Sequence, residues 1–288
     1  EIAPIIGTDK KNKCVQKINL NKKSLLPDKE TYLKNVQKIL SDLENKKYSK
    51  LVLSRIEKYT LSHNIPADLI INTIIKKHTN CFNFMIKKNN YYFIGSSPEE
   101  LITLNKKNYF TKALAGTSKK DTLIYNKKEL QEHEYVIEHI KKILEPISSR
   151  IDIKRNKKPL NLDYAYHLKT PIEGELIKNS HILNVLNSLY PTPALAGSPI
   201  EESKLNIQKI EENDRGWFGG SVGFYTNNGN GKFYVPIRSC LVDKNEIYFY
   251  AGSGIVDGSS AENEWNETKI KLTHMKSIID ELIQNNIN

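Results

Sequence analysis

The segment Glu246-Ile-Tyr-Phe-Tyr-Ala-Gly-Ser-Gly-Ile255 leads, after a short turn, into Ala261-Glu-Asn-Glu-Trp-Asn-Glu-Thr-Lys-Ile-Lys271. Aromatic and apolar residues at its start predict a strand over Glu246–Ala251. Apolar residues at helical spacing predict a helix from about residue 262 to 286. The glycines at 252 and 254 miss the dinucleotide-binding fingerprint and follow the last predicted strand, so we exclude a Rossmann domain.

Patterns outside this segment predict a chain that mixes helices and strands. Helical spacing of apolar residues predicts further helices over residues 28–43, 66–77, 127–145, 181–189 and 201–212. Short β-type runs predict strands over residues 50–55, 81–86, 91–94 and 232–237. Because the two kinds of element alternate irregularly, the pattern favours an α/β or α+β fold over a helix bundle or an all-β sandwich.

The formal net charge of the 288-residue chain is +10, which invites a nucleic-acid-binding interpretation. Only five of its 43 basic residues are Arg, and the Lys residues are scattered along the chain. Nucleic-acid surfaces favour clustered Arg for bidentate phosphate contacts. We therefore expect no nucleic-acid partner, and keep a basic, non-enzymatic binder as the alternative from a different class.

Cysteine usage and hydropathy favour a cytoplasmic protein. Cys14, Cys81 and Cys240 lie far apart, show no zinc-type spacing and imply no disulfide framework. No run reaches the roughly 18 apolar residues that a membrane span needs. The first ten residues lack the pattern of a signal peptide, so no membrane partner is expected.

The terminal helix carries a charged stripe beside an apolar one. Glu264, Glu267 and Lys271 are three and four residues apart and share one face, next to an apolar face that begins with Trp265. The simplest interpretation is an exposed salt bridge worth a few tenths of a kcal/mol, roughly the value for i,i+4 pairs. The alternative is a functional stripe, because it borders the core.

The helix over 127–145 repeats this arrangement, since Glu132-His133-Glu134 precedes Val136 and Ile137. Two helices that each present Glu at a core border could meet over a hard cation such as Mg²⁺. That ion binds a few carboxylates, keeps several waters and takes its other ligands from an anionic substrate. Because carboxylates on helices are usually solvated, both interpretations stay open at this point.

Other candidates also have two interpretations. Arg238 ends an apolar run, where it is either paired structurally or binds a carboxylate. Lys50 is the first residue of a predicted strand, where it is either an ordinary surface residue or a half-buried general base. His167 has no metal-ligand partner at useful spacing and fits a hydrogen-bonded core histidine. Glycine segments at 113–117 and 251–255 offer backbone amides that could hold a carboxylate.

These features form an ordered series of motifs. The series is Lys50-Leu-Val-Leu-Ser-Arg55, Gly95-Ser-Ser-Pro-Glu99, Ala113-Leu-Ala-Gly-Thr117, Glu132-His133, Pro191-Thr-Pro-Ala-Leu-Ala-Gly197, Asp214-Arg-Gly-Trp-Phe-Gly-Gly220, Ile237-Arg238, Gly252-Ser-Gly254-Ile255 and Glu264-Trp-Asn-Glu267-Thr-Lys-Ile-Lys271. From about residue 28 to 286 the chain resembles the chorismate-utilising enzymes, which include anthranilate, aminodeoxychorismate, salicylate and isochorismate synthases.

The resemblance implies an α+β fold of two facing, mainly antiparallel sheets, flanked by helices, with the active site between them. It also implies Mg²⁺ as cofactor and chorismate, a cyclic dicarboxylate, as substrate. The implied metal ligands are Glu132 and Glu267, with Glu264 close by or acting through water. The implied substrate-binding residues are Gly116, Thr117, His167, Ala194, Phe218, Arg238, Gly252, Gly254 and Lys271.

Positions that differ between branches of the family favour isochorismate synthase. Lys50 matches a general base that activates water, where the anthranilate branch has Gln. Aminodeoxychorismate synthases carry a nucleophilic Lys where this chain has Ala115. Glu99 matches the general acid that protonates the departing 4-hydroxyl. Burial would raise the pKa of that Glu and lower that of the Lys, and attack of water at C2 then yields isochorismate.

Salicylate synthase, which goes on to eliminate pyruvate, is the alternative within the family. Ala194 and Phe218 resemble the isochorismate branch, whereas the lyase branch tends to carry Thr and Tyr at these sites. The anthranilate and aminodeoxychorismate readings are less favoured, so no glutaminase subunit is expected. The family contains monomers and homodimers, and the resemblance leaves open a siderophore, menaquinone or salicylate pathway.

The N-terminal part departs from the family pattern. Members usually carry a longer segment that completes one sheet, whereas here 27 residues precede the first matching helix. We therefore expect an N-terminal segment at 1–27, a candidate for truncated sheet strands, and a chorismate-binding catalytic domain at 28–288.

Overall fold

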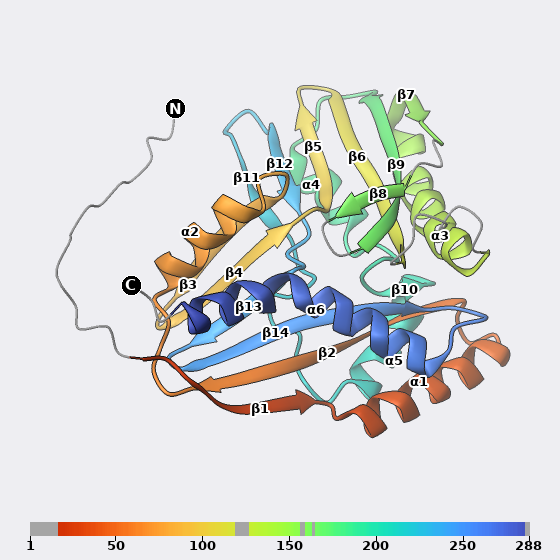
Figure 1. Ribbon diagram of the computed structural model, residues 1–288. Coiled ribbons are helices and arrows are strands. Elements are labelled where there is room, and N and C mark those ends of the chain that lie inside the picture. The colour runs from red at the N-terminus through yellow and green to blue at the C-terminus, as the bar shows by residue number, and fades with distance from the viewer. Residues whose placement is uncertain (1–16, 119–126, 156–158, 163–164, 286–288) are drawn as a thin grey trace.

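The structure is a computed structural model that describes residues 17–118, 127–155, 159–162 and 165–285. Within these ranges two seven-stranded sheets account for all the strands, and every pairing between strands is antiparallel (Figure 1). We name them sheet A and sheet B. The α+β expectation of two antiparallel sheets flanked by helices is thereby confirmed.

Sheet A contains the strand predicted at the start of the C-terminal segment. Its order is β1 (Leu20–Leu26), β2 (Lys50–Leu61), β14 (Glu246–Ile255), β13 (Ser239–Asp243), β4 (Tyr91–Ser97) and β3 (Phe82–Lys88), with the short β10 (Gly197–Ser198) also paired to β2. β2 is twice as long as its predicted range because β1 and β14 pair with it on either side.

Sheet B lies above sheet A in the view of Figure 1. Its order is β11 (Val222–Tyr225), β12 (Gly231–Tyr234), β5 (Glu100–Asn105), β6 (Asn108–Ser118), β9 (Ala165–Leu176) and β7 (Ser148–Ile153), with β8 (Pro159–Leu162) also paired to β9. Most of these strands were not predicted. In β9 the buried residues Leu168, Thr170 and Ile172 do alternate with less buried ones, but charged residues and Pro171 obscure the pattern.

The predicted helices are confirmed to within a few residues. They are α1 (Lys29–Glu44), α2 (Ala67–Lys77), α3 (Lys127–Leu144), α4 (Ile182–Leu189), α5 (Ile200–Ile210) and α6 (Ala261–Gln284), with a 3₁₀ turn at Glu145–Ile147. The Asp28 side chain caps α1 by accepting from the Thr31 backbone N–H at 2.8 Å. No helix in the described ranges is long and apolar enough to cross a membrane.

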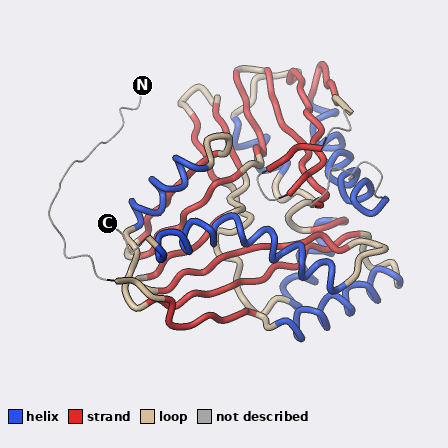
Figure 2. The backbone as a smooth tube through the Cα atoms, viewed as in Figure 1, coloured by secondary structure: helices blue, strands red, loops and turns tan. Residues whose placement is uncertain are grey.

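Each sheet packs against one long helix through an apolar cluster of its own. In α6, Leu272, Met275 and Ile279 pack with Ile247 and Phe249 of β14 against sheet A. In α3, a comparable stripe packs against sheet B; its members are Val136, Ile137, Ile140 and Leu144. Figure 2 shows both helices lying along the strands they cover. The polar edges of α3 and α6 therefore come together where the two sheets meet.

The residue range 1–27 contains β1, which pairs with β2 from Leu20 to Leu26 and forms one edge of sheet A. The sequence showed no clear period in this strand, because Lys22, Lys23 and Ser24 interrupt its apolar residues. The division of the chain at residues 27 and 28 stays a prediction.

Candidate active site

A cavity lies between the two sheets and is lined by residues from both. Sheet A contributes Val52 and the β14 residues Tyr250–Gly252, and sheet B contributes Leu114–Gly116 and His167. The predicted site residues that line it are Glu99, Gly116, Glu132, His167, Ala194, Phe218, Arg238, Gly252 and Lys271. Residues from ten separate segments of the chain thus meet at one place.

Lys50, the first residue of β2, is fully buried and directed at α3. Its Nζ donates to Glu132 Oε1 at 3.0 Å. Gly254 makes this contact possible, because a Cβ at position 254 would overlap Glu132 Oε1 and Lys50 Cε. The structure therefore gives Gly254 a packing role beside the predicted base, behind the cavity wall.

Glu132 sits among cations. Burial raises its pKa, but Lys50, Lys128 and Lys271 together outweigh burial and hold the pKa below its ordinary value. Its Oε1 accepts from Lys50, whereas its Oε2 is buried and has no hydrogen-bond partner among the described residues. Such an orphaned carboxylate oxygen is an available ligand for a cation.

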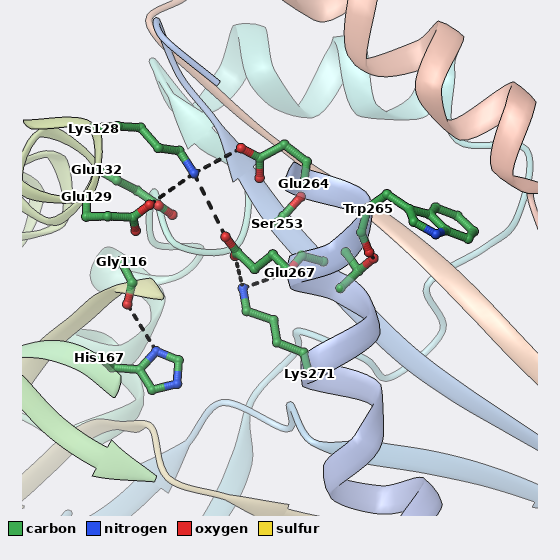
Figure 3. A network of polar contacts seen from close by, with 12 residues as sticks. Gly116, Lys128, Glu129, Glu132, His167, Ser253, Glu264, Trp265, Glu267 and Lys271 are labelled. Atoms are coloured by element: carbon green, nitrogen blue, oxygen red, sulfur yellow. Dashed lines mark hydrogen bonds and ion pairs between the residues drawn. The ribbon is translucent and has the colours of Figure 1, made fainter. Parts of the chain in front are cut away.

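Lys128, which the sequence analysis did not single out, lies between the carboxylates of α3 and α6. Its Nζ is 2.9 Å from Glu264 Oε1, 3.3 Å from Glu129 Oε1 and 3.9 Å from Glu267 Oε2 (Figure 3). Burial lowers the pKa of Lys128, but the nearby carboxylates outweigh burial and hold the pKa above its ordinary value. The sequence did contain a signal for this position, because Lys128 lies four residues before Glu132 and therefore on the same face of α3.

Glu264 and Glu267 of α6 are buried, so the interpretation of an exposed salt bridge is wrong. The side chain of Glu264 is fully buried, and burial and the nearby charge of Glu267 raise the pKa of its carboxyl group. Glu267 is only 8% exposed, and its Oε1 accepts from Lys271 Nζ at 2.7 Å. The second contact of Lys271 is to the carbonyl oxygen of Gly252 at 2.9 Å, which fixes the ammonium beside the cavity.

The carboxylate cluster has the donor chemistry of an Mg²⁺ site without its geometry. Carboxylate oxygens are the ligands that Mg²⁺ prefers, and Glu132 Oε2 is unused. However, no three His, Cys, Asp or Glu side chains in the described part of the chain are arranged to hold a metal ion. Instead, the ammonium of Lys128 lies among the carboxylates that a metal would need.

Glu99 lies in the short connection between β4 of sheet A and β5 of sheet B. Its backbone is anchored, because its N–H donates to Ser97 Oγ at 3.1 Å and its carbonyl accepts from the Val235 N–H at 2.9 Å. Burial raises the pKa of its carboxyl group to about 7, against the opposing charges of Lys112, Lys271 and other cations. A carboxylic acid with that pKa can donate a proton near neutral pH.

His167 and Arg238 form a hydrogen-bonded pair on the cavity wall. The Arg238 Nη2 lies 3.1 Å from His167 Nε2, and His167 Nδ1 lies 3.1 Å from the Gly116 carbonyl oxygen. Because a guanidinium only donates, Nε2 accepts and Nδ1 carries the proton. Burial, with Arg238 and Lys271 nearby, lowers the pKa of His167 well below its ordinary value. His167 is therefore a neutral positioning group for Arg238.

Backbone strain accompanies this pair. Arg238 adopts φ of +52°, and Gly116 adopts φ of +76° at an irregularity of the β6–β9 ladder. A positive φ is uncommon for a residue with a side chain, and strained positions cluster at functional sites. Thr117 lies opposite His167 in the ladder.

The apolar part of the cavity wall includes Ala194 and Phe218. Phe218 stacks on Tyr250 with ring centroids 5.5 Å apart. Arg215, which the sequence analysis did not assign, ties this wall to β2: it donates to the carbonyls of Leu195 and Val52, each at 2.8 Å, and pairs with Glu211. The sequence offered a weak signal for this role, because Arg is rare in the chain and Arg215 is one of only five.

Comparisons with known proteins place the chain in a family. The family model described as chorismate binding enzyme matches residues 4–280. The isochorismate synthase MenF of Bacillus subtilis is 32% identical over 265 residues, which are 88% of this chain and 56% of that protein. The isochorismate synthase EntC of Escherichia coli K12 is 28% identical over 275 residues, 91% of this chain and 70% of that protein.

Solved structures show the same fold. A crystal structure of a putative 2,3-dihydroxybenzoate-specific isochorismate synthase, DhbC from Bacillus anthracis, matches with a TM-score of 0.87 at 28% identity, covering 94% of this chain and 75% of that one. Anthranilate synthase component I from Streptococcus pneumoniae shares the fold, with a TM-score of 0.79 at 20% identity over 89% of this chain and 60% of that one.

The chain spans little more than half the length of the B. subtilis relative. The matched region is nevertheless nearly all of this chain, and it includes both sheets and the cavity between them. On the sequence match, the shared fold and the motif residues gathered at the cavity, the chain belongs to the family of chorismate-binding enzymes.

Proposed function

We propose that this chain is an isochorismate synthase, which converts chorismate to isochorismate with Mg²⁺ as cofactor. The observation that carries the proposal is a cavity that combines the buried carboxyl group of Glu99, whose pKa burial raises to about 7, with two cations, Arg238 and Lys271. The cavity borders the buried Lys50–Glu132 pair. Relatives named isochorismate synthases at about 30% identity over most of the chain support it.

The two cations suit the substrate class. Chorismate carries two carboxylates, and Arg238 and Lys271 each present a cationic side chain to the cavity. Arg238 can bind a carboxylate through two parallel N–H donors, while neutral His167 holds it in place without adding charge. Ala194 and Phe218 supply the apolar surface for the ring.

Lys50 and Glu99 carry the proton transfers. Lys50 takes a proton from a water molecule as its oxygen bonds to C2, and the ring double bonds shift. The shifting electrons expel the oxygen at C4 in the same displacement, and Glu99 donates a proton to the leaving hydroxyl, which departs as water. One water enters and one leaves, so the reaction is an isomerisation that needs no oxidant or reductant. A buried acid and base positioned in this way contribute roughly 10²–10⁴-fold each.

Glu132, Glu267 and Glu264 would hold Mg²⁺. When bound, the ion would orient a substrate carboxylate and neutralise the carboxylate that faces Lys50. The support is the orphaned Glu132 Oε2 and the oxygen-only donor set.

The remaining expectations are part of the proposal. We expect a cytoplasmic monomer or homodimer that acts without a glutaminase subunit and binds no nucleic acid. Its partners are chorismate and isochorismate.

Product analysis tests the function. Purified chain is incubated with chorismate, with and without Mg²⁺, and the products are separated by chromatography alongside a pyruvate assay. A Mg²⁺-dependent mixture of chorismate and isochorismate without pyruvate is expected. Salicylate with pyruvate would assign the chain to the salicylate synthases instead, and absence of any turnover would overturn the proposal.

A further inference from the structure

The carboxylate cluster between α3 and α6 is neutralised by lysines. Glu129, Glu132, Glu264 and Glu267 are each at most 8% exposed. Three ammonium groups contact them, from Lys50, Lys128 and Lys271. With every carboxylate ionised, four negative charges face three positive ones.

The three lysines are held differently. Lys50 is fully buried and contacts Glu132, and Lys271 is fixed between Glu267 and the Gly252 carbonyl. Lys128 instead lies within 4 Å of carboxylates from both helices, so its ammonium bridges α3 and α6. Its side chain keeps 17% exposure, which leaves it a path toward solvent.

A bridging ammonium and a bridging metal ion exclude one another. Mg²⁺ binds oxygen at about 2.1 Å, whereas the Lys128 nitrogen already lies 2.9 Å from Glu264 Oε1. Both cannot occupy the space beside Glu264 and Glu267, two of the three proposed metal ligands, on grounds of volume and of charge. Exchange of the Lys128 ammonium for a divalent cation would bring the cluster from one net negative charge to neutrality.

We propose that Lys128 is a tethered cation that occupies the metal position of this cluster and must swing out before a divalent cation binds. The inference rests on the Mg²⁺ site of the proposed function. Lys128 then keeps α3 and α6 together in the metal-free chain and weakens the apparent affinity for Mg²⁺. A competitor that fills a site nine-tenths of the time weakens binding about tenfold.

Titration of the substrate-free chain with Mg²⁺, followed by isothermal calorimetry, tests the inference. Replacement of Lys128 by Met should lower the apparent Kd about tenfold relative to the unmodified chain. Lys127→Met is the matched control, because Lys127 is the exposed neighbour on the same helical turn, and its Kd should not change.

Lys271→Met separates competition from net charge. It also removes one positive charge that contacts Glu267, so an effect of charge alone would tighten Mg²⁺ binding equally in both variants. Competition predicts a clearly larger change for Lys128→Met. An equal change in the two variants, an unchanged or weaker affinity in Lys128→Met, or no cation binding in any variant would overturn the inference.

Thermal unfolding provides the second readout. Without metal, Lys128→Met should melt at a lower temperature than the unmodified chain, and Mg²⁺ should raise its melting temperature more. If Lys128→Met does not fold, Lys128→Gln keeps a polar side chain and undergoes the same titration. Chorismate turnover is measured separately, so a chain that binds Mg²⁺ as expected but forms no isochorismate would refute the function and leave the competition intact.

Discussion

Burial sets the chemistry of Glu99. Glu99 is 7% exposed, and desolvation raises the pKa of its carboxyl group to about 7 even though Lys112, Lys271 and Lys50 oppose the shift. A charged group in a poorly solvated site is disfavoured. The sequence shows only a glutamate in a Ser-Ser-Pro-Glu motif, so this property depends on what surrounds it.

Replacement of Glu99 by Gln should therefore abolish turnover and leave substrate binding nearly unchanged, because the amide has the same shape but no proton to donate. A loss of at least 100-fold in kcat is expected for a general acid. Glu100→Gln is the control, since Glu100 contacts Thr103 and Lys232. Turnover by the unmodified chain should also decline as the pH rises above about 7, where Glu99 loses its proton.

Lys50 is tied to Glu132 as part of a buried ion pair. Lys50→Gln keeps a hydrogen-bond donor near Glu132 but removes the base, so kcat should drop by roughly 10²–10⁴-fold. Steady-state kinetics and a substrate-binding titration check this. Turnover that survives in Lys50→Gln would remove Lys50 from the reaction.

At the scale of elements, β14 leads into α6 beside the cavity, and one of its glycines leaves space for a side chain of α3. Gly252 and Gly254 both lie on β14 opposite β2, yet they differ in what surrounds them. A Cβ at Gly254 would overlap Glu132 and Lys50, whereas a Cβ at Gly252 would first meet Val52 Cγ1 at 3.3 Å. The first position is therefore closed to any side chain, and the second is only crowded.

Gly254→Ala should lower the free energy of unfolding by about 1–3 kcal/mol, the usual cost of overpacking, and should separate Lys50 from Glu132. Urea denaturation measures the loss, and turnover should decline with it. Gly252→Ala provides the comparison and should destabilise less. Equal stability of Gly254→Ala and the unmodified chain would contradict the tight packing at this strand.

At the scale of the whole molecule, buried titratable side chains from elements far apart in the sequence pack against one another. His274 of α6 stacks on His78 at the end of α2, with ring centroids 3.9 Å apart. Burial lowers the pKa of His274 to about 2, helped by the charge of Arg238. The folded chain thus holds His274 neutral, while the unfolded chain protonates it near its ordinary pKa of 6.5.

Because the unfolded state binds the extra proton, the stability contributed by neutral His274 is present above pH 6.5 and is lost as the pH falls toward 2. The loss is about 1.4 kcal/mol per pH unit for one such group. Urea unfolding at pH 7, 6 and 5 should show a shallower pH dependence for His274→Gln than for the unmodified chain. Identical slopes would show that His274 does not titrate in this way.

The sequence by itself determined the helices, the family and the identity of the motif residues. Its apolar periodicity identified α1, α3 and α6. These signals are local, because a helix buries one face at a spacing that the sequence displays directly. Strands such as β9 were missed, since their pairing partners lie far away in the chain and charged residues obscure the alternation.

Only the tertiary structure decided what the charged residues do. Glu264, Glu267 and Lys271 have the spacing of an ordinary exposed salt-bridge stripe, and the burial of the two carboxylates follows from α6 and α3 meeting at the junction of the two sheets. The same packing places the Lys128 ammonium within 4 Å of three carboxylates and raises the pKa of Glu99. Burial and the distance between charges set these properties, and both depend on residues far apart in the sequence.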